Sequence, residues 1–264
     1  MLRDITIGQY FPGDSIIHRL DPRFKLIITF IYIIMLFAGD RFICLGVGAL
    51  FTLLAIFLSR IPLKMFVKSV KPLLPFLLIT AILNLFFVTS GDVLFKWKFI
   101  KITDDAVSIS IFMFVRITLL IMGSSLLTYT TSPITLTDAI EKLLSPLKKI
   151  KVPVHELAMM MSIALRFIPT LIEETDKIMS AQKARGAEID SGSFMTRAKN
   201  MIAILVPLFI SSFRRADELA TAMECRCYRG GEGRTRLRQL KSAPRDYIAL
   251  AIAIAFWIVN IIIG

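Results

Sequence analysis

The chain has 264 residues, of which 55% are hydrophobic, and its mean hydropathy is +0.69. A soluble domain of this length buries its core without becoming so apolar, so the composition places the chain among membrane proteins. The net charge of +12 does not indicate a nucleic-acid-binding protein, because the basic residues crowd certain loops and form no stripe with surface aromatics.

Five apolar segments are long enough, or nearly so, to cross about 30 Å of hydrocarbon as helices. In chain order they cover residues 24–38, 42–58, 72–88, 106–128 and 247–263. The first is the shortest and needs flanking residues to span. The pattern predicts an all-α membrane protein with about five transmembrane helices.

The positions of Lys and Arg predict how these helices are oriented. Basic residues dominate the segment before the first span, the loop between the second and third spans, and the stretch 129–246, which holds 19 of the 32 Lys and Arg. The other two connections carry little net positive charge. By the positive-inside rule the basic segments lie in the cytosol, and with five spans the C-terminus lies outside.

The long stretch after the fourth span begins with a short amphipathic segment, residues 132–150. Its apolar residues Ile140, Leu143 and Leu147 recur at helical spacing, and Ser132 or Thr137 is available as an N-cap. We predict an interfacial helix here.

Two longer segments that resemble one another follow, at residues 155–186 and 194–226. Each begins with an interrupted apolar stretch, contains one proline (Pro169 or Pro207) and then becomes polar and amphipathic. Because a proline removes a backbone hydrogen bond and bends a helix, we predict two long bent helices. The alternative is two further spans, and Arg166 argues against it because an arginine in mid-bilayer costs several kcal/mol.

Both segments end in the same frame, in which an alanine is followed by two residues, a small residue, an arginine and another small residue. The frame occurs in AQKARGAE (181–188) and AMECRCYR (222–229), around Arg185 and Arg226. A guanidinium binds carboxylates bidentately, and small neighbours let a partner approach closely. A single such arginine would be a cation favoured by the helix dipole, whereas the repetition indicates two equivalent docking points.

Motifs for catalysis or cofactor binding are not found. The sequence has no P-loop, and GGEGRTRL (230–237) lacks the lysine that a phosphate-binding loop needs. Neither His18 nor His155 has a second metal ligand at suitable spacing, and the Cys225–Cys227 pair has no second pair. The adjacent Asp104 and Asp105 are typical of a turn or helix cap. We therefore expect a protein that is not an enzyme and holds no cofactor or metal of its own.

The two arginine segments resemble the coupling motifs of the T component of energy-coupling factor (ECF) transporters. GQYFPGDSIIHRLDPRFKL near the N-terminus and SPITLTDAIEKLLSPLK resemble the same family, so the match covers essentially the whole chain. The T component is the membrane scaffold of an ABC-type importer of vitamins or metal ions. The resemblance implies that two cytosolic ATPase subunits, which bind ATP and Mg, dock on the two arginine motifs. It also implies that a substrate-binding membrane S component packs on the amphipathic helices.

These expectations assign residues and domains. The ATPase-docking residues are Ala184, Arg185, Gly186, Cys225, Arg226 and Cys227. The apolar faces predicted to bind the S component, or otherwise to form an internal core, lie around Met159, Ile163, Leu165, Ile202, Leu205 and Phe209. The expected domains are transmembrane helices 1–4 in 1–128, a cytosolic coupling domain in 129–244 and a last transmembrane helix in 245–264. The chain departs from the family where Cys225 and Cys227 replace a small residue and a glycine.

Two other classes of membrane protein compete with this interpretation. A conventional ABC permease would line a substrate path with polar residues, but the spans offer few besides Asn84 and Arg116. An intramembrane enzyme would need pairs of His, Asp or Glu within the spans, and none is seen. We therefore expect a multi-pass cell-membrane subunit that transmits ATP-driven motion from two ATPases to an S component.

Overall fold

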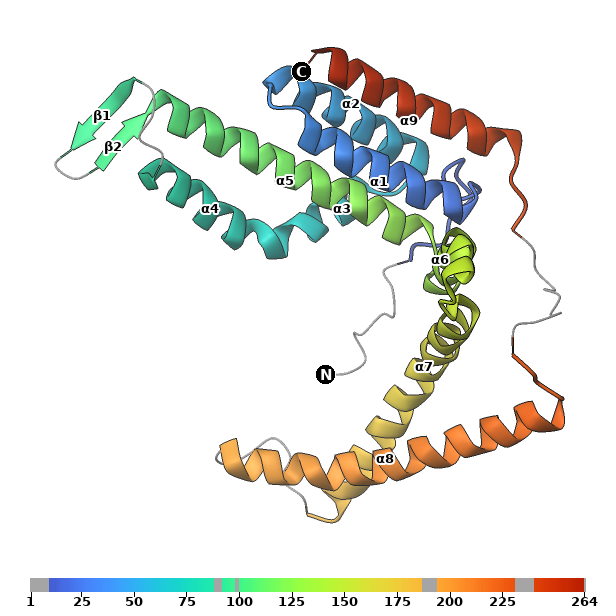
Figure 1. The fold of residues 1–264 in the computed structure, drawn as a ribbon. Coiled ribbons are helices and arrows are strands. Elements are labelled where there is room, and N and C mark those ends of the chain that lie inside the picture. The colour runs from blue at the N-terminus through green and yellow to red at the C-terminus, as the bar shows by residue number, and fades with distance from the viewer. Residues whose placement is uncertain (1–9, 88–91, 98–99, 187–193, 231–239, 264) are drawn as a thin grey trace. The chain divides into compact units, whose positions relative to one another are not determined.

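The computed structural model describes residues 10–87, 92–97, 100–186, 194–230 and 240–263, and it is built almost entirely of helices (Figure 1). The α-helices are α1 (Pro22–Ala38), α2 (Phe42–Ser59), α3 (Leu63–Val70), α4 (Leu74–Phe87), α5 (Asp104–Thr130), α6 (Pro133–Leu144), α7 (Val154–Ala184), α8 (Phe194–Cys225) and α9 (Pro244–Ile263). Short 3-10 turns, Lys71–Leu73 and Ser145–Ile150, follow α3 and α6. The predicted all-α class is confirmed with one addition, an antiparallel hairpin of β1 (Val93–Trp97) and β2 (Ile100–Thr103).

Contacts divide the described residues into two compact units. The bundle unit comprises residues 10–139 and 240–263, and the helix-pair unit comprises 140–186 and 194–230. The first holds α1 to α5 and α9, and the second holds α7 and α8. Each unit is described separately below.

The bundle unit is organised around α5, which packs against α1, α2, α3 and α4, while α9 packs against α1 and α2. Tyr32 of α1 lies at the centre of the core. Its hydroxyl donates to the carbonyl of Leu119 and is hydrogen-bonded to the Thr52 hydroxyl, at 2.8 and 2.7 Å. A methyl group at Gly123 would overlap the Tyr32 ring, so the glycine lets α1 and α5 approach. Small residues have this role where helices associate in lipid, since packing stabilises the contact there.

Among the residues that the structure describes, five helical segments are long and apolar enough to cross a membrane: α2, the continuous Leu63–Phe87, α5, α7 and α9. The number agrees with the five spans predicted, but the two sets differ in one helix, because α7 is included and α1, which has 17 residues, is not. About 17 residues is still the lower limit for a spanning helix. Because α1 packs among the spans of the bundle, we treat it as a membrane helix.

The basic segment between the second and third predicted spans was expected to be a loop, and this prediction is wrong. Residues 63–70 form α3, which continues through a 3-10 turn into α4. The apolar residues of this segment recur at helical spacing, and Phe66 is fully buried with its ring against that of Tyr129, 5.4 Å between centroids. Burial of this aromatic face holds a lysine-rich sequence in a helix.

Buried charged side chains form hydrogen bonds that hold the two ends of α1 against neighbouring segments. At one end the Asp246 carboxylate accepts from the backbone N–H of Asp21 at 2.9 Å and of Ala243 at 2.7 Å. Lys25 donates to the carbonyl of Thr130 at 2.8 Å. At the other end Arg116 of α5 donates to the carbonyl of Gly39, where α1 ends. These bonds compensate the cost of placing polar groups in a bundle interior.

The helix-pair unit begins with the last residues of α6. A helix was predicted over 132–150, and the structure has α6 over Pro133–Leu144 followed by the 3-10 turn. The Ser132 hydroxyl accepts from the backbone N–H of Thr135 at 3.4 Å. Thr137 is not the cap, since its hydroxyl donates back to the carbonyl of Pro133. The Glu141 carboxylate accepts a hydrogen bond from Nδ1 of His155 at 3.0 Å, which links α6 to the start of α7.

Both long helices continue through their prolines, Pro169 in α7 and Pro207 in α8. They cross with opposite chain directions. Arg215 donates to Glu174 at 3.1 Å, and further along, the Gln182 amide donates to the carbonyl of Ala203 at 3.3 Å. Ala203 precedes Pro207 by four residues, so the missing N–H of Pro207 leaves that carbonyl without an intrahelical donor. The proline of α8 therefore creates the acceptor that α7 uses.

Candidate docking site

The two predicted arginine motifs lie at the C-terminal ends of α7 and α8. Arg185 caps α7, and its backbone N–H donates to the carbonyls of Ala181 and Gln182 at 3.2 and 3.1 Å. Gly186 follows with φ +85° and donates to the carbonyl of Lys183 at 3.0 Å. A left-handed residue directly after the cap is the usual way to satisfy the last carbonyls of a helix.

The end of α8 repeats this geometry. The backbone N–H of Arg226 donates to the carbonyl of Met223 at 3.1 Å, and Cys227 follows with φ +55°. The N–H of Cys227 donates to the carbonyl of Glu224 at 2.8 Å, and that of Tyr228 to Met223 at 3.0 Å, which is the Schellman pattern. Cys227 thus occupies the left-handed position that Gly186 occupies on α7. This explains why the related motif favours glycine here.

The residues predicted to dock the ATPases are all accessible. Ala184, Arg185, Gly186, Cys225, Arg226 and Cys227 are exposed. Within the described part of the chain, neither Arg185 nor Arg226 forms an ion pair. Each arginine is exposed directly after the last turn of a helix, and a guanidinium in such a position can bind a carboxylate.

The crossing keeps the two arginines apart. Arg185 lies three residues beyond Gln182, whereas Arg226 lies 23 residues beyond Ala203, the partner of Gln182. At 1.5 Å per residue the separation along α8 is about 35 Å.

The residues predicted to form the S-component surface fall into two groups. Ile202, Leu205 and Phe209 of α8 are exposed, whereas Met159, Ile163 and Leu165 of α7 are half-buried. Ile163 lines a cavity of about 280 Å³ between α7 and α8. Met160 and Met161, next to Met159, are exposed as well, and so are apolar residues of these helices that were not predicted, namely Leu157, Met195, Met201, Val206, Ile210 and Phe213. Helical spacing from Leu205 and Phe209 would have found Met201 and Phe213.

Comparison with known proteins decides the family. Residues 13–237 match the family model described as CbiQ, cobalt transport protein. The chain is 56% identical over 263 residues to the energy-coupling factor transporter transmembrane protein EcfT of Clostridium kluyveri, covering 99% of this chain and 97% of the relative. The chain belongs to this EcfT family. Proteins of the same name in Ruminiclostridium cellulolyticum and Lactococcus lactis are 54% and 45% identical, over 98% and 99% of this chain and 97% and 98% of theirs.

Membership of the EcfT family confirms the resemblance that the arginine motifs indicated. The chain is a multi-pass transmembrane component of an ECF transporter in the cell membrane. In the described part of the chain no group of three or more His, Cys, Asp or Glu residues is placed to hold a metal ion.

Proposed function

We propose that this EcfT chain is the coupling subunit of its transporter, and that it transmits ATP-driven motion from two cytosolic ATPase subunits to a substrate-binding S component during micronutrient uptake. One observation carries the proposal: two crossing helices end in the same exposed arginine followed by a left-handed residue. In this proposal ATP and Mg are bound by the ATPases.

Each arginine would enter a groove on a different ATPase and meet acidic groups there. Truncating one partner of a buried, hydrogen-bonded charge pair costs about 2–5 kcal/mol, much of it from the charge left unpaired. The small neighbours Ala184 and Cys225 leave room for the groove wall. The two arginines lie about 35 Å apart along α8, a distance that suits one ATPase on each.

The exposed apolar face of α8 would bind the S component. Ile202, Leu205 and Phe209 lie on this face, and Phe209 is 63% exposed. Exposed apolar patches of this kind mark contacts with other proteins or with lipid. Flexible methionines, including the exposed Met160 and Met161 of α7, adapt to partners of different shape.

The test is co-purification in mild detergent together with substrate uptake in cells. Arg185→Ala or Arg226→Ala alone should weaken one ATPase contact and sharply reduce uptake, and the double variant should lose both ATPases. Lysine at either position should restore function only in part, because a point charge cannot replace a planar fork of donors.

Phe209→Glu provides the matched control on the same unit. It should release a small, very hydrophobic membrane protein while both ATPases stay bound. Retention of both ATPases at wild-type level and normal uptake in the double arginine variant would show that the arginines are only helix-end cations.

A further inference from the structure

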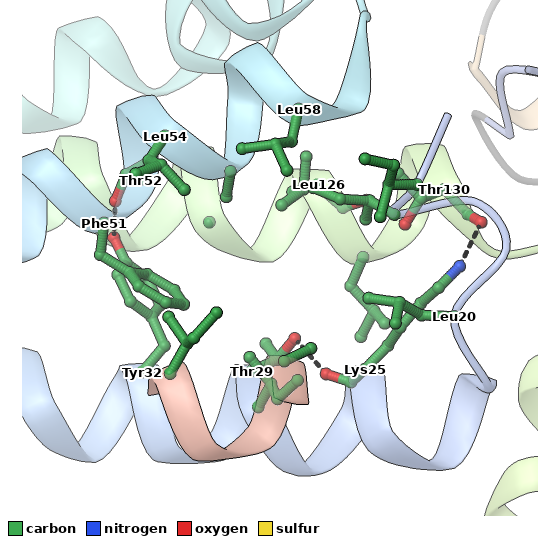
Figure 2. Close-up of a pocket in the computed structure, with 18 of the residues that line it drawn as sticks. Leu20, Lys25, Thr29, Tyr32, Phe51, Thr52, Leu54, Leu58, Leu126 and Thr130 are labelled. Carbon is green, nitrogen blue, oxygen red and sulfur yellow. Dashed lines mark hydrogen bonds between the residues drawn. The ribbon is translucent and has the colours of Figure 1, made fainter. Parts of the chain in front are cut away.

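A cavity of about 350 Å³ lies in the bundle unit between α1, α2, α5 and α9 (Figure 2). The helices α2 and α9 are in contact beside it, where the side-chain amide of Asn260 donates to the carbonyl of Cys44 at 3.1 Å, and the rings of Phe51 and Phe256 lie 5.4 Å apart. Side chains of both helices line the cavity, among them Phe51, Leu54 and Leu58 of α2 and Ile248 and Ile252 of α9.

The lining presents almost no free polar group. The Tyr32 hydroxyl is bonded to Thr52, and the Thr29 hydroxyl donates to the carbonyl of Lys25 at 2.8 Å. The Lys25 ammonium points to the end of α5 and donates to the carbonyl of Thr130 (Figure 2). What remains is hydrocarbon, so the chemistry of the walls selects an apolar occupant rather than water.

The cavity has an open side between two membrane helices. Leu54 of α2 and Ile248 and Ile252 of α9 line it, and all three side chains are about half exposed. Arg245, in the first turn of α9, is the second charged residue of the lining and is exposed. Within the described residues Arg245 forms no ion pair, whereas the Lys25 ammonium donates hydrogen bonds to His18, Thr130 and Thr131.

We propose that this cavity binds one acyl chain of an anionic phospholipid, whose phosphate lies on Arg245. The bilayer supplies acyl chains at the open side, and the apolar walls take them at no cost in hydrogen bonds. The free guanidinium at the end of a membrane helix selects a negative headgroup, as basic pockets between transmembrane helices do. The proposal is independent of the coupling role, because all lining residues belong to the bundle unit.

Photocrosslinking of the full-length protein in nanodiscs tests it. Phosphatidylcholine nanodiscs would contain a small fraction of phosphatidylglycerol with a diazirine on its acyl chain, and labelled peptides would be mapped by mass spectrometry. Labelling should concentrate on residues 51–58 and 248–252, severalfold above the lipid-facing residues of α4. Ala249→Phe, which fills the cavity from α9, should abolish this excess, and Ala55→Phe should do so from the opposite wall.

One control distinguishes labelling in the cavity from labelling at the general lipid surface. A second distinguishes recognition of the headgroup from binding of the acyl chain. Ala251→Phe adds the same ring at an exposed position outside the lining and should leave labelling unchanged. Arg245→Gln should lower the preference for phosphatidylglycerol over an equally labelled phosphatidylcholine by about fivefold, while Arg60→Gln should not. The proposal is overturned if the cavity peptides are labelled no more than α4. It is also overturned if neither phenylalanine variant, when folded, lowers their labelling. Equal labelling of the wild type by the two lipids overturns the role of Arg245.

Discussion

Arg116 shows how a charged residue becomes part of a membrane bundle. The guanidinium is buried, donates to the carbonyl of Gly39 and lies over the Phe112 ring, 4.4 Å from its centroid. Its contact with Asp40 is long, at 3.4 Å, and the Asp40 side chain is 94% exposed. The bond to the backbone and the contact with the ring therefore matter more than the ion pair.

Arg116→Met should accordingly destabilise the bundle, because it leaves the Gly39 carbonyl without its donor, at a cost of about 1–3 kcal/mol. Asp40→Asn should have almost no effect. Thermal unfolding can be followed by a thiol-reactive dye at the buried Cys44, in a Cys225→Ala, Cys227→Gly background. A larger shift of the midpoint for Asp40→Asn than for Arg116→Met would contradict this ranking.

Cys227 makes a second prediction at the residue scale. Its φ of +55° favours glycine, and a non-glycine residue there costs roughly 1 kcal/mol. Cys227→Gly should therefore slow hydrogen exchange of the Tyr228 amide, which is bonded to Met223, and Cys227→Val should accelerate it. Cys225→Ala, inside the helix, serves as the control and should change exchange little. Faster exchange in Cys227→Gly would be incompatible with the left-handed turn.

At the scale of elements, the link between α7 and α8 depends on Pro207. Gln182→Leu should destabilise the wild type by about 1 kcal/mol, because the carbonyl of Ala203 loses its donor. In a Pro207→Ala background the restored backbone N–H satisfies that carbonyl, so the same substitution should cost almost nothing. Denaturation of the four proteins in mild detergent measures the coupling. Thr221→Ala, on the exposed face of α8, is the control, and its effect on the free energy of unfolding should add to that of Gln182→Leu. If the effects of Pro207→Ala and Gln182→Leu also add, the link between Pro207 and Gln182 is ruled out.

Prediction of these elements from sequence succeeded where one physical constraint dominates. Hydrocarbon forces α2, α5 and α9 to be continuous apolar helices, so their positions follow from hydropathy. It failed for α3, whose lysines suggested a loop although Phe66 fixes a helix by packing on Tyr129. The left-handed turn after each arginine was not anticipated, and the bond between Gln182 and Ala203 joins residues that only the crossing of two helices brings together.

At the scale of the whole molecule, the topology expected from the basic residues remains to be measured. An impermeant maleimide added to intact cells should label Asp92→Cys, before the hairpin, and should not label Ser242→Cys, before α9, in a background without the native cysteines. Both positions are exposed. Permeabilised cells should show labelling at Ser242→Cys, which confirms that the site is reactive. Labelling at Ser242→Cys in intact cells would invert the orientation.

The two arginines lie at unequal distances from the contact between Glu174 and Arg215. Both prolines lie before this contact, so the segments beyond it are uninterrupted helix. From Glu174 to Arg185 the segment is about 16 Å long, and from Ser211, which also bonds Glu174, to Arg226 it is about 22 Å. The shorter segment is bonded to α8 again through Gln182 and Ala203, and the longer one lines the cavity that α8 shares with α7. Neither end is a free lever, so a force applied at one arginine is passed to the other helix along the whole of their contact.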